Sequence, residues 1–226
     1  MAIPATGPCP PGRRPSPIMA ELDARTLNWR FVVPDEPRRL LLLPAGGERL
    51  DDAVSPELSA SALSAALRDG PYPAVAAPDL AGWAWLERAG GAAGLLARLG
   101  DAVGPGGWLF AGFPNAWYPA HPASPGSLGL GAARRILRRS GLGIEEAYLA
   151  LPDQRCPAYL VSTGGPAELE YFLRRLFRPY AGSLSGWRAR LRQRSLSIMR
   201  TVALGLPHRL RVRFAPALGI VARRPS

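Results

Sequence analysis

The sequence has no lysine, two histidines and two cysteines, and each scarcity narrows the class of protein. Cys9 and Cys156 are too few for a disulfide framework or a cysteine-rich zinc site. No run of about 18 apolar residues occurs, so we expect no membrane-spanning helix. Residues 1–17 are rich in Pro and Gly and too polar for a secretory signal, so we expect a flexible tail and a cytoplasmic protein.

The net positive charge of the chain lies in its C-terminal part. The acidic and basic residues before position 166 balance, whereas residues 166–226 carry 13 arginines against Glu168 and Glu170, which accounts for the net charge of +11. The lack of lysine beside abundant Ala, Gly, Pro and Arg is typical of a GC-rich genome, so part of the arginine content reflects codon supply. The asymmetry along the chain is not explained in that way and favours an anionic partner.

The length and hydrophobic content favour a single domain. A chain of 226 residues with 47% hydrophobic residues can bury one substantial core, and we expect one domain over residues 18–226. The first part of it predicts a short helix over residues 18–26 and a strand over residues 27–34. Leu40–Leu43 form a continuous apolar run, which is typical of a central parallel strand covered on both faces.

Helices and strands then alternate in the predicted order. Ser55, followed by Pro56 and Glu57, predicts the start of a helix that ends at Gly70. The later elements predicted are a strand over 71–80, a helix over 91–103, a Pro-Gly-Gly turn at 105–107, a strand over 108–113, a helix over 131–139, strands over 144–151 and 157–163, and one or two strands after residue 208. This alternation predicts an α/β fold with a doubly wound, mostly parallel sheet and right-handed crossovers.

The stretch VGPGGWLFAGFPN at residues 103–115, together with this order of elements, resembles the class I S-adenosylmethionine-dependent methyltransferases. The resemblance implies a Rossmann-like methyltransferase fold in which LLLLPAGG is the first strand with its cofactor loop, and the strand ending at Asp79 is the fourth. It implies that S-adenosylmethionine contacts Pro44, Gly46, Gly47 and Asp79.

Two features depart from the family. Leu42 stands where the first strand of the family ends in an acidic residue. Residues 48–70 have room for one helix and little else, whereas the family usually places two βα units there. Asp51 and Asp52 are the acids in this segment that are candidates for the cofactor's ribose, although neither follows a convincing strand.

Candidate catalytic and substrate-binding residues follow the fourth and fifth strands of the resemblance. Asp79 would orient an acceptor atom, or alternatively would cap the helix that begins at Leu80. His121 is the natural general base, with a solvent-exposed loop histidine as the alternative. Asn115 and Tyr118 lie in the same loop and are candidates for binding substrate.

The basic segment predicts an inserted helical cap over residues 164–206. Apolar residues recur at helical spacing after Pro166 and again over 185–203, with arginines between them, and Arg174 and Arg188 are candidates for binding substrate. Such a surface attracts phosphates, acidic proteins or anionic lipids, and the alternative is a solvated polar face. Nucleic acid is not favoured, because no nucleic-acid module accompanies the charge.

Two functions follow from these observations. The first is transfer of a methyl group from S-adenosylmethionine to a small-molecule or peptide acceptor in a biosynthetic setting. The second is a catalytically inactive methyltransferase-like partner or regulatory subunit, a pseudoenzyme that binds another protein through its arginine-rich cap. Leu42 and the short segment 48–70 favour the second.

Overall fold

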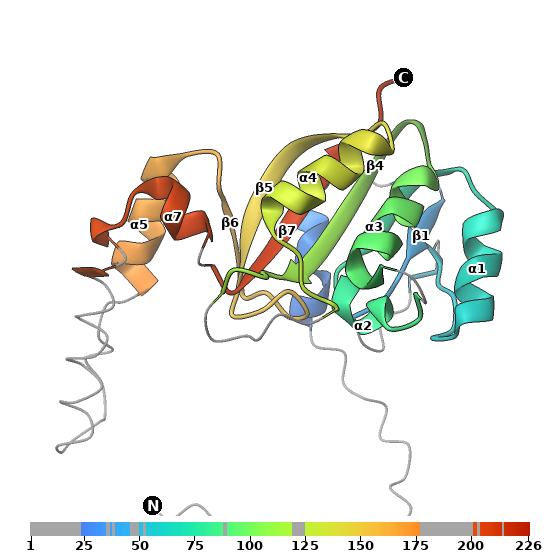
Figure 1. The fold of residues 1–226 in the computed structure, drawn as a ribbon, viewed down its shortest axis with the longest axis horizontal. Helices are drawn as coiled ribbons and strands as arrows, with labels where there is room; N and C mark the ends of the chain where they lie inside the picture. Colours follow the sequence, from blue (N-terminus) through green and yellow to red (C-terminus); the bar gives the residue numbers. More distant parts are fainter. Residues whose placement is uncertain are drawn as a thin grey trace, which may run out of the picture.

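A computed structural model shows an α/β fold built on one mixed sheet (Figure 1). It describes residues 24–34, 37, 39–45, 50–51, 53–87, 90–118, 125–176, 201–202, 204–213 and 215–226. The strands are β1 (Leu40–Leu42), β2 (Ala53–Val54), β3 (Tyr72–Ala77), β4 (Val103–Pro114), β5 (Gly143–Leu151), β6 (Tyr159–Ser162) and β7 (Ala217–Arg223). Their order across the sheet is β2-β1-β3-β4-β7-β5-β6.

Five of the seven strands point in one direction. β2, β1, β3 and β4 pair in parallel, and β7 runs antiparallel to both β4 and β5, so β5 points the same way as β4. β6 returns antiparallel beside β5 and forms the edge. The expectation of a mostly parallel sheet in an α/β fold is therefore confirmed.

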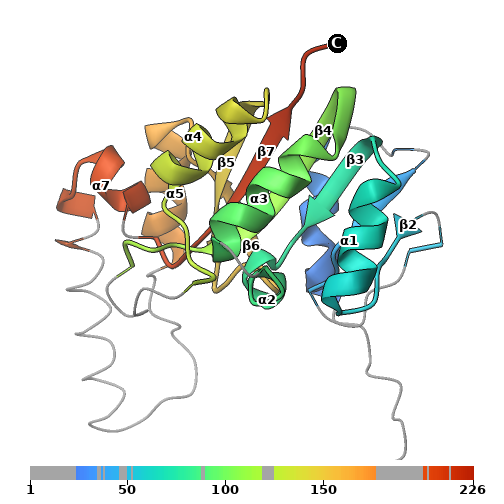
Figure 2. The same cartoon turned by 45° about the vertical axis from the view of Figure 1, so that its right-hand side comes forward.

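Four helices cover one face of the sheet: α1 (Ala60–Arg68), α2 (Leu80–Ala84), α3 (Gly91–Asp101) and α4 (Leu130–Arg139) (Figures 1 and 2). The helix predicted over 91–103 is confirmed as α3, and its Leu95, Leu96 and Leu99 are fully buried on this face. Each fully buried leucine contributes on the order of 2 kcal/mol of hydrophobic stabilisation. This face is the main core of the protein.

The opposite face is covered by η1, a 3-10 helix over Ala24–Phe31, and not by the strand predicted for residues 27–34. Thr26 and Trp29 are both buried and stand three residues apart, which is the repeat of a 3-10 helix. Trp29 stacks on Phe110 with ring centroids 5.8 Å apart. The prediction was wrong because a single large side chain packing on the sheet decided the conformation.

Three other predicted boundaries change. Helix α1 begins one turn later than expected, because the Ser59 hydroxyl and not Ser55 accepts the Ala62 N–H at 3.2 Å as the N-cap. The final segment holds the short helix α7 (His208–Arg213) before β7, where only strands were expected. The described residues between 50 and 70 contain the two-residue β2 and α1, so the expectation of one helix and little else is confirmed there.

The expected Pro-Gly-Gly turn is a bulge inside β4. Tyr72 pairs with Val103 and Ala74 pairs with Trp108, so β4 uses three more residues than β3 over this stretch. Gly106 takes a φ of +68°, and a Cβ on Gly107 would lie 2.7 Å from the Pro73 carbonyl oxygen. The two glycines therefore serve the bulge, one through its conformation and the other through close approach of two backbones.

The basic segment is described in part. Helix α5 (Pro166–Leu176) is present as expected and packs beside β6, with Leu169 buried in the main core. Residues 177–200 lie outside the described part of the chain, as does most of the second helix expected over 185–203. Among the described residues, no helix combines the length and apolar character needed to cross a bilayer.

Replacing Gly107 by alanine should lower the free energy of unfolding by about 1–3 kcal/mol, because the added methyl group meets backbone that has no space to yield. Gly131→Ala is the matched control: this exposed helical glycine has no neighbour within 4 Å of an added Cβ, so the variant should be more stable by up to about 1 kcal/mol. Urea denaturation measures both changes. A Gly107→Ala variant as stable as the parent would contradict the bulge.

Tyr72 makes the free energy of unfolding depend on pH in the alkaline range. Its hydroxyl donates to the Ala66 carbonyl oxygen at 2.7 Å, and burial raises the pKa of the phenol above its ordinary value of 10.0, with the Arg39 guanidinium opposing the shift. The folded state keeps this proton where the unfolded chain loses it, so the stabilisation is complete below about pH 10 and declines as pH rises further. Tyr72→Phe should flatten that decline between about pH 9 and pH 11, measured by urea denaturation. An unchanged slope would contradict this assignment.

Candidate functional site

The carboxyl ends of the parallel strands form one rim of the sheet. Pro44 follows β1, Asp79 follows β3 and Asn115 follows β4, so these three positions lie at the same edge of the sheet. β5 also ends at this edge, and residues 152–157 leave from it. Open α/β sheets bind ligands at this edge, so we take the rim as the candidate functional site. Gly46 and Gly47 lie outside the described residues.

The Asp79 carboxylate is buried and held by two side chains of the loop after β5. Gln154 Nε2 donates to Oδ1 at 2.9 Å, and Arg155 Nε forms an ion pair with Oδ2 at 2.9 Å. Only 3% of Asp79 is exposed. Asp79 occupies the N-cap position of α2, as the capping alternative expects, but its side chain makes no capping hydrogen bond. Both carboxylate oxygens are committed within the protein.

The loop of residues 152–157 is the part of the site that the sequence did not reveal. Asp153 Oδ1 accepts the backbone N–H groups of Arg155 and Cys156 at 2.8 and 3.1 Å, which shapes the turn. Asn28 of η1 donates its side-chain N–H to the Pro157 carbonyl oxygen at 2.6 Å and anchors the far end of the loop. Pro152 and Asp153, directly after the strand predicted for 144–151, were the sequence signal that could have indicated this loop. A turn that follows a strand parallel to β4 lies at the same rim.

Asn115 ties the end of β4 to the chain entering β7. Its side-chain amide donates to the carbonyl oxygens of Arg213 and Ala215, both at 2.8 Å, and Oδ1 accepts the Trp117 N–H at 3.2 Å. Asn115 is 1% exposed. Both of its donor hydrogens are therefore used to hold the rim together.

Tyr118 and Arg174 are the other predicted site residues that the structure describes. Tyr118 is half-buried in the turn after Asn115, whose carbonyl oxygen accepts the Tyr118 N–H at 3.0 Å. Arg174 lies on α5 and pairs with Glu170 at 2.6 Å; this hydrogen bond lowers the pKa of the Glu170 carboxyl. α5 packs beside β6, and β4, β7 and β5 separate β6 from β3. His121 and Arg188 lie outside the described residues.

The described residues directly after β1 carry no side chain able to bind the amino group or the ribose of S-adenosylmethionine. Leu42 and Leu43 are buried apolar side chains, and the Pro44 carbonyl oxygen accepts the Trp83 indole N–H at 3.0 Å. No carboxylate of the described part of the chain follows β1 directly. The position of the family's first acidic residue, Leu42, therefore holds no charge here.

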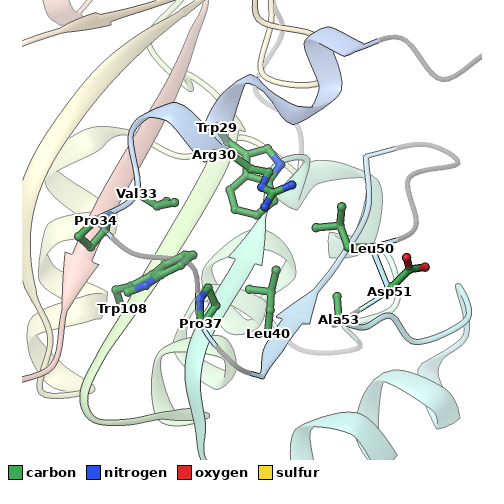
Figure 3. A pocket seen from close by; sticks show the side chains of 10 residues that line it. All are labelled: Trp29, Arg30, Val33, Pro34, Pro37, Leu40, Leu50, Asp51, Ala53 and Trp108. Carbon is green, nitrogen blue, oxygen red and sulfur yellow. The ribbon is translucent and has the colours of Figure 1, made fainter.

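Asp51 lies at the amino end of β2, away from the rim, so the suggestion that it contacts a ribose there is wrong. It borders a cavity of about 390 Å³ beneath η1 (Figure 3). Trp29 and Trp108 form aromatic walls of this cavity, and Leu40 and Ala53 from β1 and β2 line it as well. Asp52, the other acid considered for the ribose, lies outside the described residues.

A second hollow, of about 240 Å³, opens beside Asn115. Trp117, Leu130, Val212 and Leu218 supply its apolar lining, with arginines of α7 beside it. The Arg213 guanidinium lies 4.0 Å from the centre of the Trp117 ring, and Trp117 is 54% exposed. We call this hollow the rim notch.

Neither a metal centre nor a known family accounts for the site. Within the described residues, no group of three His, Cys, Asp or Glu side chains is placed to hold a metal ion. Compared with models of protein families and with curated proteins, the sequence matches none. The interpretation of the site therefore depends on its own geometry.

Replacing Asp79 by alanine removes the acceptor of Gln154 and the partner of Arg155. Gln154 is buried, so its amide is left without an acceptor, and the free energy of unfolding should fall by about 1–3 kcal/mol. Asp101→Ala, which removes an exposed carboxylate at the end of α3, should change it by less than about 0.5 kcal/mol. Urea denaturation at neutral pH compares the two, and equal effects would contradict the role given to Asp79.

Proposed function

We propose that this chain is a methyltransferase-like protein that serves as a binding partner or regulatory subunit and does not itself transfer methyl groups. The observation that carries the proposal is that Gln154 and Arg155 bond to the two carboxylate oxygens of Asp79. In the methyltransferases that the sequence resembles, this position orients the acceptor. A carboxylate with both oxygens committed to protein partners is poorly suited to that task.

The strand positions support the methyltransferase-like part of the proposal. The strands that the resemblance equates with the first, fourth and fifth of the family are β1, β3 and β4, which are neighbours and parallel. The end of β1 supports loss of the cofactor, because Leu42 replaces the acidic residue of the family. A leucine can neither bind an ammonium group nor anchor a water molecule.

Methyl transfer from S-adenosylmethionine is the second candidate, and one observation favours it. Pro44, Asp79 and Asn115 share the edge where open α/β sheets bind ligands, and the sequence keeps Gly46 and Gly47 after Pro44. A sulfonium is already a good leaving group, and proximity supplies most of the acceleration, so few catalytic side chains are required. This candidate requires Arg155 to leave Asp79.

Isothermal titration with S-adenosylmethionine separates the two candidates. We expect no heat of binding at millimolar cofactor, because the described rim offers no carboxylate directly after β1 and both oxygens of the Asp79 carboxylate bond to side chains of the protein. Arg155→Ala is the informative variant: it frees one oxygen of Asp79 but should leave the titration silent. Micromolar binding by the unmodified protein would overturn the proposal and support the enzyme.

A further inference from the structure

Helix α4 presents four exposed arginines that the fold does not use. Arg134, Arg135, Arg138 and Arg139 make no hydrogen bond or ion pair within the described part of the chain, while Ala133 and Leu137 of the same helix are buried in the core. They form two columns with i,i+4 spacing, where side chains are about 5–6 Å apart and like charges destabilise the helix. We call these four residues the arginine stripe.

The arginine stripe leads to the rim notch. Gly131 in the first turn of α4 borders both the rim notch and the shallow hollow formed by the stripe, so the two surfaces are continuous. Arg209 and Arg213 of α7 extend the positive charge around the notch. An apolar recess of about 240 Å³ therefore stands at one end of a row of guanidinium groups.

We propose that the arginine stripe and the rim notch bind an acidic segment of a partner protein, with one bulky apolar side chain in the notch and carboxylates on the stripe. The inference depends on the proposed role as a partner subunit and specifies the partner's chemistry. Guanidinium groups bind carboxylates in a bidentate manner. One apolar anchor buried in a pocket commonly supplies much of an interface's binding energy.

The same residues favour a protein over nucleic acid or a membrane. The exposed positions of α4 are Gly131 and the four arginines, which offer no apolar side chain to enter a lipid layer. The exposed ring of the notch, Trp117, already carries the Arg213 guanidinium on its face, where a base would have to stack. A phosphate backbone would also leave the accessible apolar surface of Leu130 and Val212 in the notch uncovered. An acidic segment with an apolar anchor uses both surfaces.

The synthetic peptide FAAAEEAAEEAA tests the proposal, because its glutamates follow the phenylalanine at the helical spacing that the arginines have after Leu130, a lining residue of the notch. We expect the fluorescein-labelled peptide to bind the full chain at low salt and to weaken steeply as salt rises. Replacing its phenylalanine by alanine should weaken binding at least about tenfold. Replacing its glutamates by glutamine should abolish binding, since the attraction is one of charge.

Protein variants locate the binding surface. Arg134→Gln combined with Arg138→Gln should weaken peptide binding roughly tenfold, whereas Arg68→Gln, an exposed arginine on α1, should change it less than about twofold. Gly131→Leu places a side chain in open space at the mouth of the notch and should remove the advantage of the phenylalanine peptide over its alanine version. Circular dichroism confirms that each variant is folded.

Three outcomes would overturn the inference: equal affinity for the phenylalanine and alanine peptides, equal loss in the α1 and α4 variants, or tighter binding of oligouridylate or phosphatidylglycerol vesicles than of the peptide. Its failure is distinguishable from that of the proposed function, because peptide binding and S-adenosylmethionine binding are measured separately. A chain that binds the cofactor but also the peptide disproves only the earlier proposal.

Discussion

Strand β7 runs antiparallel between β4 and β5, and this constraint decides which parts of the chain meet at the rim. Because β7 pairs with both neighbours, β4 and β5 point the same way and their following loops leave from one edge. The chain entering β7 supplies the Arg213 and Ala215 carbonyl oxygens that hold the Asn115 side chain. The rim therefore depends on β7, the last strand in the sequence.

Small residues then allow the loop after β5 to lie against the sheet. Gly112 of β4 pairs with Gly219 of β7, and a Cβ on Gly112 would come within 3.3 Å of the Gln154 Cβ and would clash with the Pro78 carbonyl oxygen. The absence of a side chain at Gly112 leaves the space in which Gln154 lies against β4. The contacts of Gln154 and Arg155 with the Asp79 carboxylate thus depend on the packing of the sheet as well as on charge. We therefore interpret them as a stable part of the rim.

Patterns with a clear period predicted most of the core. Leu40–Leu43 indicated a buried parallel strand, and Leu95, Leu96 and Leu99 indicated the buried stripe of α3, because burial on both faces or on one stripe leaves a direct trace in sequence. The strand predicted for residues 27–34 was wrong because the packing of Trp29 on Phe110, a residue distant in sequence, determines the conformation of this stretch. Likewise, nothing local indicated that Gln154 and Arg155 would close Asp79, since that contact spans 75 residues.

The central claim is that Arg155 stays on Asp79 when S-adenosylmethionine is present. The Nε–H group of Arg155, assigned through the Arg155→Lys variant, reports this contact directly in ¹⁵N-labelled protein. We predict a downfield resonance, protected from exchange with water, whose position does not change on adding millimolar S-adenosylmethionine. A resonance that exchanges rapidly, or that moves with saturable dependence on the cofactor, would contradict the account.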